Sequence, residues 1–261
     1  MDNQKSLGRI SSLVMVAATY LFLYVPLIVL FVFSFNTQRF PAPWTGFTLD
    51  WYRQLFRSVY LWQAFATSLI VACSATLISL GAGVGLIFYA AQGGRVGKSL
   101  GMFYGNLIIP ETVLAVSLLS FFTLIKIPLG MTTLILAHSV LGLGFVVPIT
   151  YARFRELDDT LTEASLDLGA TPLQTFFKVI LPMLRPSLIT TALLVFILSF
   201  DDFILSYFCA GSTAQTLSLY ILSMIRTGVS PVVNALSSVL LFLSSMLILL
   251  FFSIKTRTRF Y

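Results

Sequence analysis

The chain has 261 residues, of which 57% are hydrophobic and 10% charged, with a mean hydropathy of +0.94 and a formal net charge of +6. A soluble domain carries about 25% charged residues, so a compact soluble fold would expose apolar surface to water. The composition therefore predicts an all-α, polytopic membrane protein. Basic residues lie at the ends of apolar stretches rather than in one cluster, which argues against nucleic-acid binding and indicates contact with membrane lipid.

Six apolar stretches are long enough to cross a bilayer, because a helical crossing needs roughly 20 residues. We expect them to form a single transmembrane domain, 1–261, with spans at 13–35, 64–91, 101–125, 130–152, 188–210 and 232–254. The first stretch is too long for a signal-peptide core and has no cleavage site after it, so we expect it to be retained. The glycine pairs Gly81/Gly85 and Gly101/Gly105 predict close helix packing.

Lysine and arginine predict the orientation of the spans. With the N-terminus in the cytoplasm, eleven of the 16 basic residues lie inside and five lie outside. Cytoplasmic loops carry the excess of basic residues, so we expect both termini inside. The long segment 153–187 between the fourth and fifth spans is then cytoplasmic too.

Segment 153–187 is predicted to hold two short helices. In the first, Leu157, Leu161, Ala164 and Leu168 recur at helical spacing. Gly169 follows them, as glycine commonly does just past a helix C-terminus. A simple linker of this length with two defined helices is unusual, so we expect the segment to dock on a partner.

The second helix has a clear predicted start, with Thr171 as the cap, Pro172 at the first position and Gln174 completing a capping box. An apolar stripe then follows, and we expect Pro182 and Pro186 to end the helix near the membrane. The stripe consists of Leu173, Phe176, Phe177, Ile180 and Leu181.

The same segment carries a spaced motif. It reads Glu163-Ala164-Ser165, three residues, Gly169, nine residues, and then Val179-Ile180-Leu181-Pro182. This resembles the signature EAA-x3-G-x9-I-x-LP of ABC importer permeases, with Ser165 and Val179 as conservative departures.

The resemblance implies a type I ABC importer permease fold with a cytoplasmic coupling helix, in a bacterial inner membrane. It also implies no catalytic residue, cofactor or metal, because ATP hydrolysis belongs to a partner. The implied partners are two copies of an ATP-binding subunit, a second permease subunit and an extracytoplasmic substrate-binding protein. The residues implied to couple to the ATPase are Glu163, Ala164, Gly169, Phe176, Phe177, Leu181 and Pro182.

Outside the signature, the chain resembles the spermidine/putrescine permeases of this family, which implies a polyamine substrate. Val232 stands where such permeases often have an acid. The stretches that carry the resemblance are Ser34–Phe40 with Trp44 and Gly46–Tyr52, then Ser199–Asp202, and then Gly228–Pro231 with Val233–Leu236.

Three acids lie within the expected spans: Glu111, Asp201 and Asp202. Each costs roughly 2.5–3.5 kcal/mol at mid-helix on insertion scales, a cost that usually marks a pathway, a partner or a structural pair. Carboxylates in a wet passage would suit a polyamine, which carries several positive charges.

The neighbours of the acids suggest different roles. Asp202 shares a helix face with two serines, so we prefer it for the substrate path, whereas Asp201 would cap a helix or pair within the heterodimer. Glu111 follows Pro110, where we expect the third span to be broken and open to water. Tyr207 is a weaker candidate for a cation–π contact, and we expect His138 to pack or to hydrogen-bond between helices.

Two other functions remain open at this point. An ion-coupled secondary transporter would use the three acids as its ion site, although no inverted repeat supports it. An ABC permease for another small solute is the second alternative. Intramembrane catalysis and a nucleotide site at Gly97-Lys98-Ser99 lack the required motifs, since Gln92 replaces the first P-loop glycine and no strand precedes it.

Overall fold

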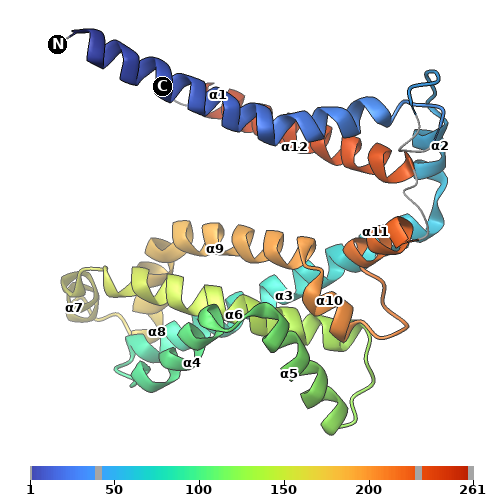
Figure 1. The fold of residues 1–261 in the computed structure, drawn as a ribbon. Coiled ribbons are helices and arrows are strands. Elements are labelled where there is room, and N and C mark those ends of the chain that lie inside the picture. Colours follow the sequence, from blue (N-terminus) through green and yellow to red (C-terminus); the bar gives the residue numbers. More distant parts are fainter. Residues whose placement is uncertain (1, 39–42, 227–230, 258–261) are drawn as a thin grey trace. The chain divides into compact units, whose positions relative to one another are not determined.

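The computed structural model describes residues 2–38, 43–226 and 231–257, and these are almost entirely helical (Figure 1). The chain divides into two compact units, one of residues up to 59 together with those from 221, and one of residues 60–220. The helices of the first unit are α1 (Asp2–Phe33), α2 (Asp50–Arg57) and α12 (Pro231–Arg257). Those of the second are α3 (Val59–Ala91), α4 (Gly97–Ile108), α5 (Glu111–Leu124), α6 (Met131–Arg155), α7 (Asp159–Asp167), α8 (Pro172–Thr175), the π-helical turn η1 (Phe176–Ile180), α9 (Leu181–Asp201) and α10 (Ile204–Cys209). Helix α11 (Leu217–Arg226) runs across the boundary between the units.

Four continuous helices are long and apolar enough to cross a membrane, at Ser12–Phe33, Val59–Ala91, Met131–Arg155 and Pro172–Asp201. A fifth crossing is added if α4 and α5 count as one span. The sixth expected span, 232–254, is helical within α12, but its side chains beyond Leu243 are described only in part. The described residues thus give four to five candidate spans, whereas six spans were expected.

Two of the expected spans are broken helices. The third breaks between Ile108 and Glu111, where the chain bends by 117°; Pro110 lacks an amide hydrogen and cannot continue the helix. The fifth, expected at 188–210, ends at Asp201 and restarts at Ile204.

The start of the fifth span also differs from the expectation. Pro182 and Pro186 do not end a helix: the chain stays helical from Pro172 to Asp201. Pro182 lies in the first turn of α9, where its missing amide hydrogen costs little. The π-helical turn Phe176–Ile180 precedes it and absorbs the change in register.

In the first unit, the stretch between α1 and α2 is packed around Asn36. The side chain of Asn36 is fully buried and accepts a hydrogen bond from the Thr45 amide at 2.9 Å, while its carbonyl accepts one from Trp51 Nε1 at 2.7 Å. Phe35 stacks on Phe47 with ring centroids 5.3 Å apart. The described part of this stretch therefore forms a folded loop, and Trp51 is one of its structural residues.

Helix α6 forms the centre of the second unit and packs against α4, α9 and α10. Small and polar residues allow this close approach. Ser79 of α3 donates a hydrogen bond to the Ser139 carbonyl at 3.0 Å, and Thr133 donates one to the Cys209 carbonyl at 2.8 Å. Such bonds satisfy polar groups where no water is available.

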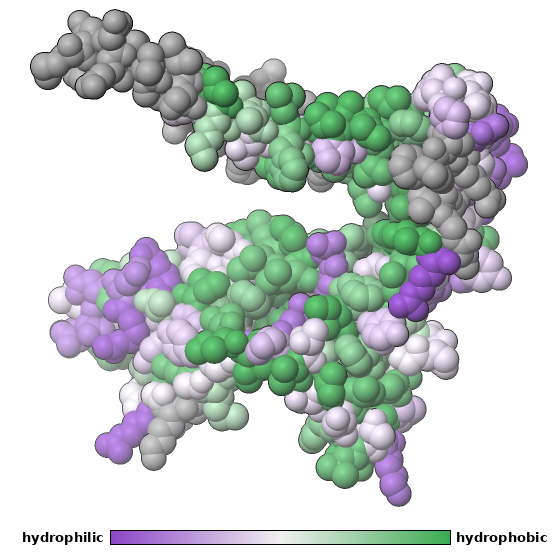
Figure 2. Space-filling model, in the orientation of Figure 1, coloured by the Kyte–Doolittle hydropathy of each residue, from purple (hydrophilic) through white to green (hydrophobic). Residues whose placement is uncertain are grey.

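Much of the outer surface of the second unit is hydrophobic, as Figure 2 shows over α9, whereas hydrophilic residues gather at α7. Within the first unit, none of the apolar window of α1 is buried. Apolar surface exposed on this scale needs lipid or partner helices to cover it.

The glycines that mediate close packing within the chain are not the expected pairs. A Cβ atom added at Gly142 would contact Ser79 Oγ and lie 2.8 Å from Val195 Cγ1. One added at Gly81 or Gly85 would meet nothing within 4 Å, and the same holds for the pair at 101 and 105. The spacing rule therefore failed here, because it does not say which helix face is turned to a neighbour.

This difference predicts opposite effects for two similar substitutions. Gly142→Ala should destabilise the protein by about 1–3 kcal/mol through overpacking. Gly85→Ala should be neutral or stabilising, because alanine favours a helix over glycine by about 1 kcal/mol. Thermal unfolding of the purified variants in detergent measures both, and equal shifts in Tm would contradict the packing at Gly142.

Candidate substrate passage and coupling loop

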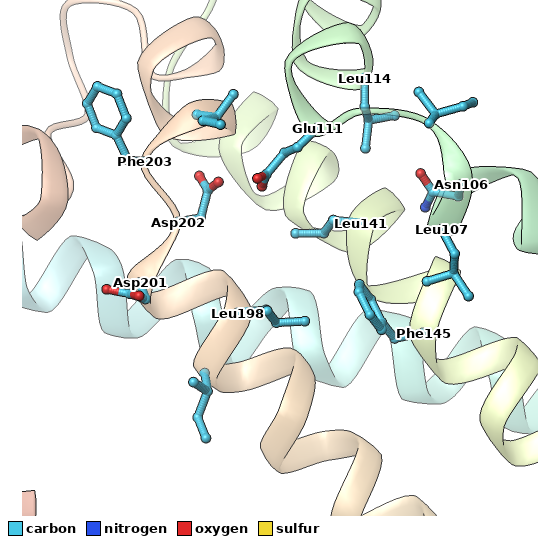
Figure 3. Close-up of a pocket in the computed structure, with 13 residues that line it drawn as sticks. Asn106, Leu107, Glu111, Leu114, Leu141, Phe145, Leu198, Asp201, Asp202 and Phe203 are labelled. Atoms are coloured by element: carbon cyan, nitrogen blue, oxygen red, sulfur yellow. The ribbon is translucent and has the colours of Figure 1, made fainter. Parts of the chain in front are cut away.

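The two broken helices face one another across a cavity of about 570 Å³ (Figure 3). The break between α4 and α5 supplies Glu111, and the break between α9 and α10 supplies Asp201 and Asp202. Apolar side chains form most of the rest of the wall, among them Leu107, Ile109, Leu114, Leu141, Phe145, Ile197 and Leu198. The cavity thus combines a hydrophobic lining with acids placed where backbone helices are interrupted.

Glu111 is the first residue of α5, directly after Pro110. Its carboxylate lies at the N-terminal end of a helix, where the helix dipole favours negative charge. Figure 3 shows the carboxyl group of Glu111 pointing toward that of Asp202 in the cavity that both residues line. Two carboxylates that face one another repel when both are charged, so the pair favours a cation between them.

Asp202 occupies the break before α10 and is 7% exposed. Its Oδ1 accepts a hydrogen bond from the Leu205 amide at 3.2 Å, and its Oδ2 accepts one from the Ser206 amide at 2.9 Å. These donors are among the amides that a helix start leaves without intrahelical partners. Asp202 therefore caps α10.

His138 of α6 links the two sides of this break. Its imidazole is fully buried, with Nδ1 2.8 Å from Ser199 Oγ on α9 and Nε2 3.4 Å from Asp202 Oδ2. Ser206 Oγ of α10 lies 3.5 Å from the same Nε2. The expected hydrogen bond of His138 between helices is confirmed by its contact with Ser199. Through Nε2, His138 also holds the buried carboxylate of Asp202 in place.

The other two path candidates lie differently. Asp201 is exposed at the end of α9, and Figure 3 draws its carboxylate pointing away from the pair formed by Glu111 and Asp202. We expected Asp201 to cap a helix or to pair within the heterodimer; the cap at this break is Asp202 instead, and pairing of Asp201 stays a prediction. Tyr207 is half-exposed, packs against Phe203 and Phe208, and does not line the cavity.

Asn106 of α4 also lines the cavity and was not among the residues predicted from the sequence. Its side-chain amide donates a hydrogen bond to the Val140 carbonyl at 2.8 Å. A lone amide inside an apolar stretch, one turn before Pro110, was the signal that could have identified it.

Segment 153–187 forms short helices with the capping box and the glycine turn that the sequence predicts. Asp158 caps α7, and hydrogen bonds from the Thr160 side chain and amide hold the pKa of its carboxyl below the usual range. Gly169 ends the turn with a φ of +82°, a conformation that favours glycine. Thr171 and Gln174 form the expected capping box, with Thr171 N to Gln174 Oε1 at 3.0 Å.

The departure from the signature at Ser165 has a structural role. Its hydroxyl lies 2.9 Å from Thr175 Oγ1. The bond joins α7 to the last residue of α8, so it fixes the angle between the two short helices of the loop.

The two phenylalanines of the predicted docking stripe have different environments. Phe176 is 2% exposed and packs against Ile87 and against Phe88, whose ring centroid lies 4.9 Å away. Phe177 is 55% exposed. Phe176 therefore attaches the loop to α3, whereas the ring of Phe177 stays accessible at the surface of this chain.

A groove of about 670 Å³ runs beside this part of the loop, between the end of α3, α7 and α8. Leu173 and Thr162 line it together with Phe88. Leu168 is 90% exposed at the turn before Gly169. The loop thus offers apolar residues and a groove at its end.

A sequence profile of the family "Binding-protein-dependent transport system inner membrane component" matches residues 4–257. The chain belongs to this family. It is accordingly an inner-membrane, multi-pass permease component rather than an enzyme.

Several relatives of this permease match it along most of its length. The spermidine/putrescine transport system permease protein PotC of Escherichia coli strain K12 is 38% identical over 247 residues, 93% of each chain. PotC of Haemophilus influenzae is 37% identical over 235 residues, 88% of this chain and 91% of that one. The putrescine transport system permease protein PotI of E. coli K12 is 36% identical over 232 residues, 85% and 82% of the two chains.

Solved structures show the same fold at low identity. The permease resembles a chain of a bacterial ABC transporter involved in the import of alginate, with a TM-score of 0.72, 17% identity and coverage of 98% and 97%. It also resembles a chain of the MetNI methionine ABC transporter, with a TM-score of 0.54, 23% identity and coverage of 81% and 98%. Both are evidence of fold alone.

Capping by Asp202 predicts how two substitutions of this residue will differ. Asp202→Ala removes both acceptors from the start of α10 and should destabilise the permease by about 1–2 kcal/mol. Asp202→Asn keeps one acceptor oxygen and should remain close to the wild-type Tm, because asparagine caps about as well as aspartate. Thermal unfolding in detergent distinguishes the two; an alanine variant as stable as the asparagine variant would exclude the capping role.

Proposed function

We propose that the chain is a transmembrane permease subunit of an ATP-driven ABC importer that moves polyamines, such as spermidine and putrescine, into the cytoplasm. The proposed substrate class rests on one observation: the carboxyl groups of Glu111 and Asp202 face one another in the cavity. The described lining of this cavity contains no Lys, Arg or His. A flexible polycation gains Coulomb energy in such a cavity, whereas an anion would be repelled. PotC and PotI, the spermidine/putrescine and putrescine permeases that are 36–38% identical to this chain, support the same substrate class.

The proposed membrane arrangement has six crossings, with both termini in the cytoplasm. It counts α4 and α5 as one broken span and α12 as the last crossing. The excess of basic residues at the proposed inner ends supports this orientation. It also places segment 153–187 on the cytoplasmic side.

The proposed partners are two ATP-binding subunits, a second permease subunit and an extracytoplasmic substrate-binding protein. The loop would enter the ATP-binding subunit through Glu163, Ala164 and Gly169, with Phe177, Leu181 and Pro182 beside them. Phe176 would act from inside, by holding the loop on α3. Leu168 and Leu173 add exposed apolar contacts.

The route from the loop to the cavity is one helix. It runs unbroken from Pro172 to Asp201, 30 residues, or about 45 Å at 1.5 Å per residue. Its first turn belongs to the loop, and its last residue precedes Asp202. A displacement of the loop by ATP-driven closure would therefore reach the capped carboxylate without a flexible linker between them.

Docking of the loop predicts that Gly169→Val will uncouple transport. Gly169 and Gly93 both have a φ of +82°, and a Cβ at either meets nothing within 4 Å, so valine strains both backbones equally. Gly169→Val should lower uptake at least tenfold at normal membrane levels, because it blocks the partner's approach. Gly93→Val is the matched control for strain alone; equal losses in the two variants would refute docking at Gly169.

The polyamine assignment predicts a charge requirement at Glu111. Glu111→Gln should reduce ATP-dependent spermidine uptake into vesicles at least about tenfold, since a hydrogen bond to a charged group contributes about 1.5–3 kcal/mol. Asp50→Asn, which neutralises an exposed carboxylate that pairs with Arg53 at 3.5 Å and accepts a hydrogen bond from Thr48 Oγ1 at 3.1 Å, controls for net charge. Unchanged uptake by Glu111→Gln would remove the polyamine passage from the proposal and leave the importer.

A further inference from the structure

Asn106 presents a buried acceptor that the fold leaves unused. Its Nδ2 donates to the Val140 carbonyl at 2.8 Å, but its Oδ1 is buried and has no hydrogen-bond partner among the described residues. Buried polar atoms are almost always paired, and an unpaired one calls for a physical explanation. Because Asn106 lines the cavity that contains the acids, this unused acceptor is placed to meet a donor that enters the cavity.

The orientation of this amide is fixed. Exchanging its oxygen and nitrogen would place Oδ1 against the Val140 carbonyl, which is another acceptor and cannot donate. Gly144, one turn further along α6, makes room for the side chain, because a Cβ there would lie 2.5 Å from Nδ2 and 3.0 Å from Cγ of Asn106. Helix α6 therefore holds the amide from two positions.

The side-chain amide of Asn106 also lies between two neighbouring cavities. Asn106, Ile109 and Leu114 line both the cavity that contains the acids and a neighbouring cavity of about 280 Å³. Figure 3 shows Asn106 across the cavity from Asp202, with Glu111 and Leu141 between them in the view. The residue precedes the bend between α4 and α5 by one turn, so it lies close to the break that supplies Glu111 to the cavity.

We propose that Asn106 Oδ1 is a specificity-determining acceptor for an N–H group of the transported cation. This inference rests on the proposed passage of polyamines through the cavity. The carboxylates of Glu111 and Asp202 attract any cation by charge, whereas a neutral amide oxygen stabilises an ammonium ion chiefly by accepting its hydrogen. Asn106 thus selects primary and secondary amines against quaternary ammonium ions of equal charge.

The test compares spermidine with its fully N-methylated analogue, which has the same charge and no N–H group. Both are radiolabelled and bound to the assembled importer, with both permeases and the ATP-binding subunits, in lipid nanodiscs without binding protein. Asn106→Leu should weaken spermidine binding about tenfold or more and change binding of the methylated analogue less than about twofold. Gly144→Ala, which displaces the intact amide, should reproduce the selective loss and serves if the leucine variant fails to assemble.

Two further variants separate the possible outcomes. Thr76→Val removes the other buried oxygen without a described partner; Thr76 does not line either cavity, so binding of both ligands should stay unchanged. Glu111→Gln should weaken both ligands, because it removes charge. The role of Asn106 is overturned, and the passage stands, if Glu111→Gln weakens binding of both ligands while Asn106→Leu changes binding of neither ligand or of both ligands equally. If the wild type binds neither ligand, the proposed passage itself fails.

Discussion

A carboxylate buried in a membrane-spanning unit needs hydrogen-bond donors, and here an interrupted helix provides them. The break between α9 and α10 frees backbone amides that an unbroken helix would use internally, and Asp202 accepts from two of them. His138 adds a third contact from α6 and is itself bonded to Ser199 on the other side of the break. The break and the acid thus stabilise each other, and the cavity exists because neither α4–α5 nor α9–α10 is continuous.

In the proposed mechanism, one helix would connect coupling to substrate recognition. The helix that ends before Asp202 begins at Pro172 in segment 153–187 and includes a π-helical turn, with Pro186 in its interior. That turn is packed rather than free, since Phe176 and Ile180 are buried against α3 and its neighbours. A force on this segment would then be transmitted along the helix to the capped break at its far end.

The sequence predicted the class of protein, the Thr171 cap of α8 and the break at Pro110, because each follows from local chemistry: hydropathy, capping side chains and a missing amide hydrogen. It failed where tertiary contacts decide. Pro182 continues a helix because it lies in the first turn of α9, and the break at Asp202 contains neither proline nor glycine. Phe176 and Phe177 share one stripe in the sequence, yet only packing against Phe88 determines that Phe176 is buried. The unpaired oxygen of Asn106 has no sequence signal at all, because its lack of a partner depends on α6.

If the cavity is the proposed passage, the same geometry would favour passage of a cation over its storage. Asp202 already accepts hydrogen bonds from the start of α10, so part of its negative charge is compensated by the helix dipole. Glu111 lies at the start of α5 and is compensated in the same way. A cation that enters the cavity would therefore be attracted less strongly than by two carboxylates whose charge is not compensated. Conduction requires binding strong enough to admit the ion and weak enough to release it, and placing both acids at helix N-termini achieves this balance without a basic side chain to compete with the substrate.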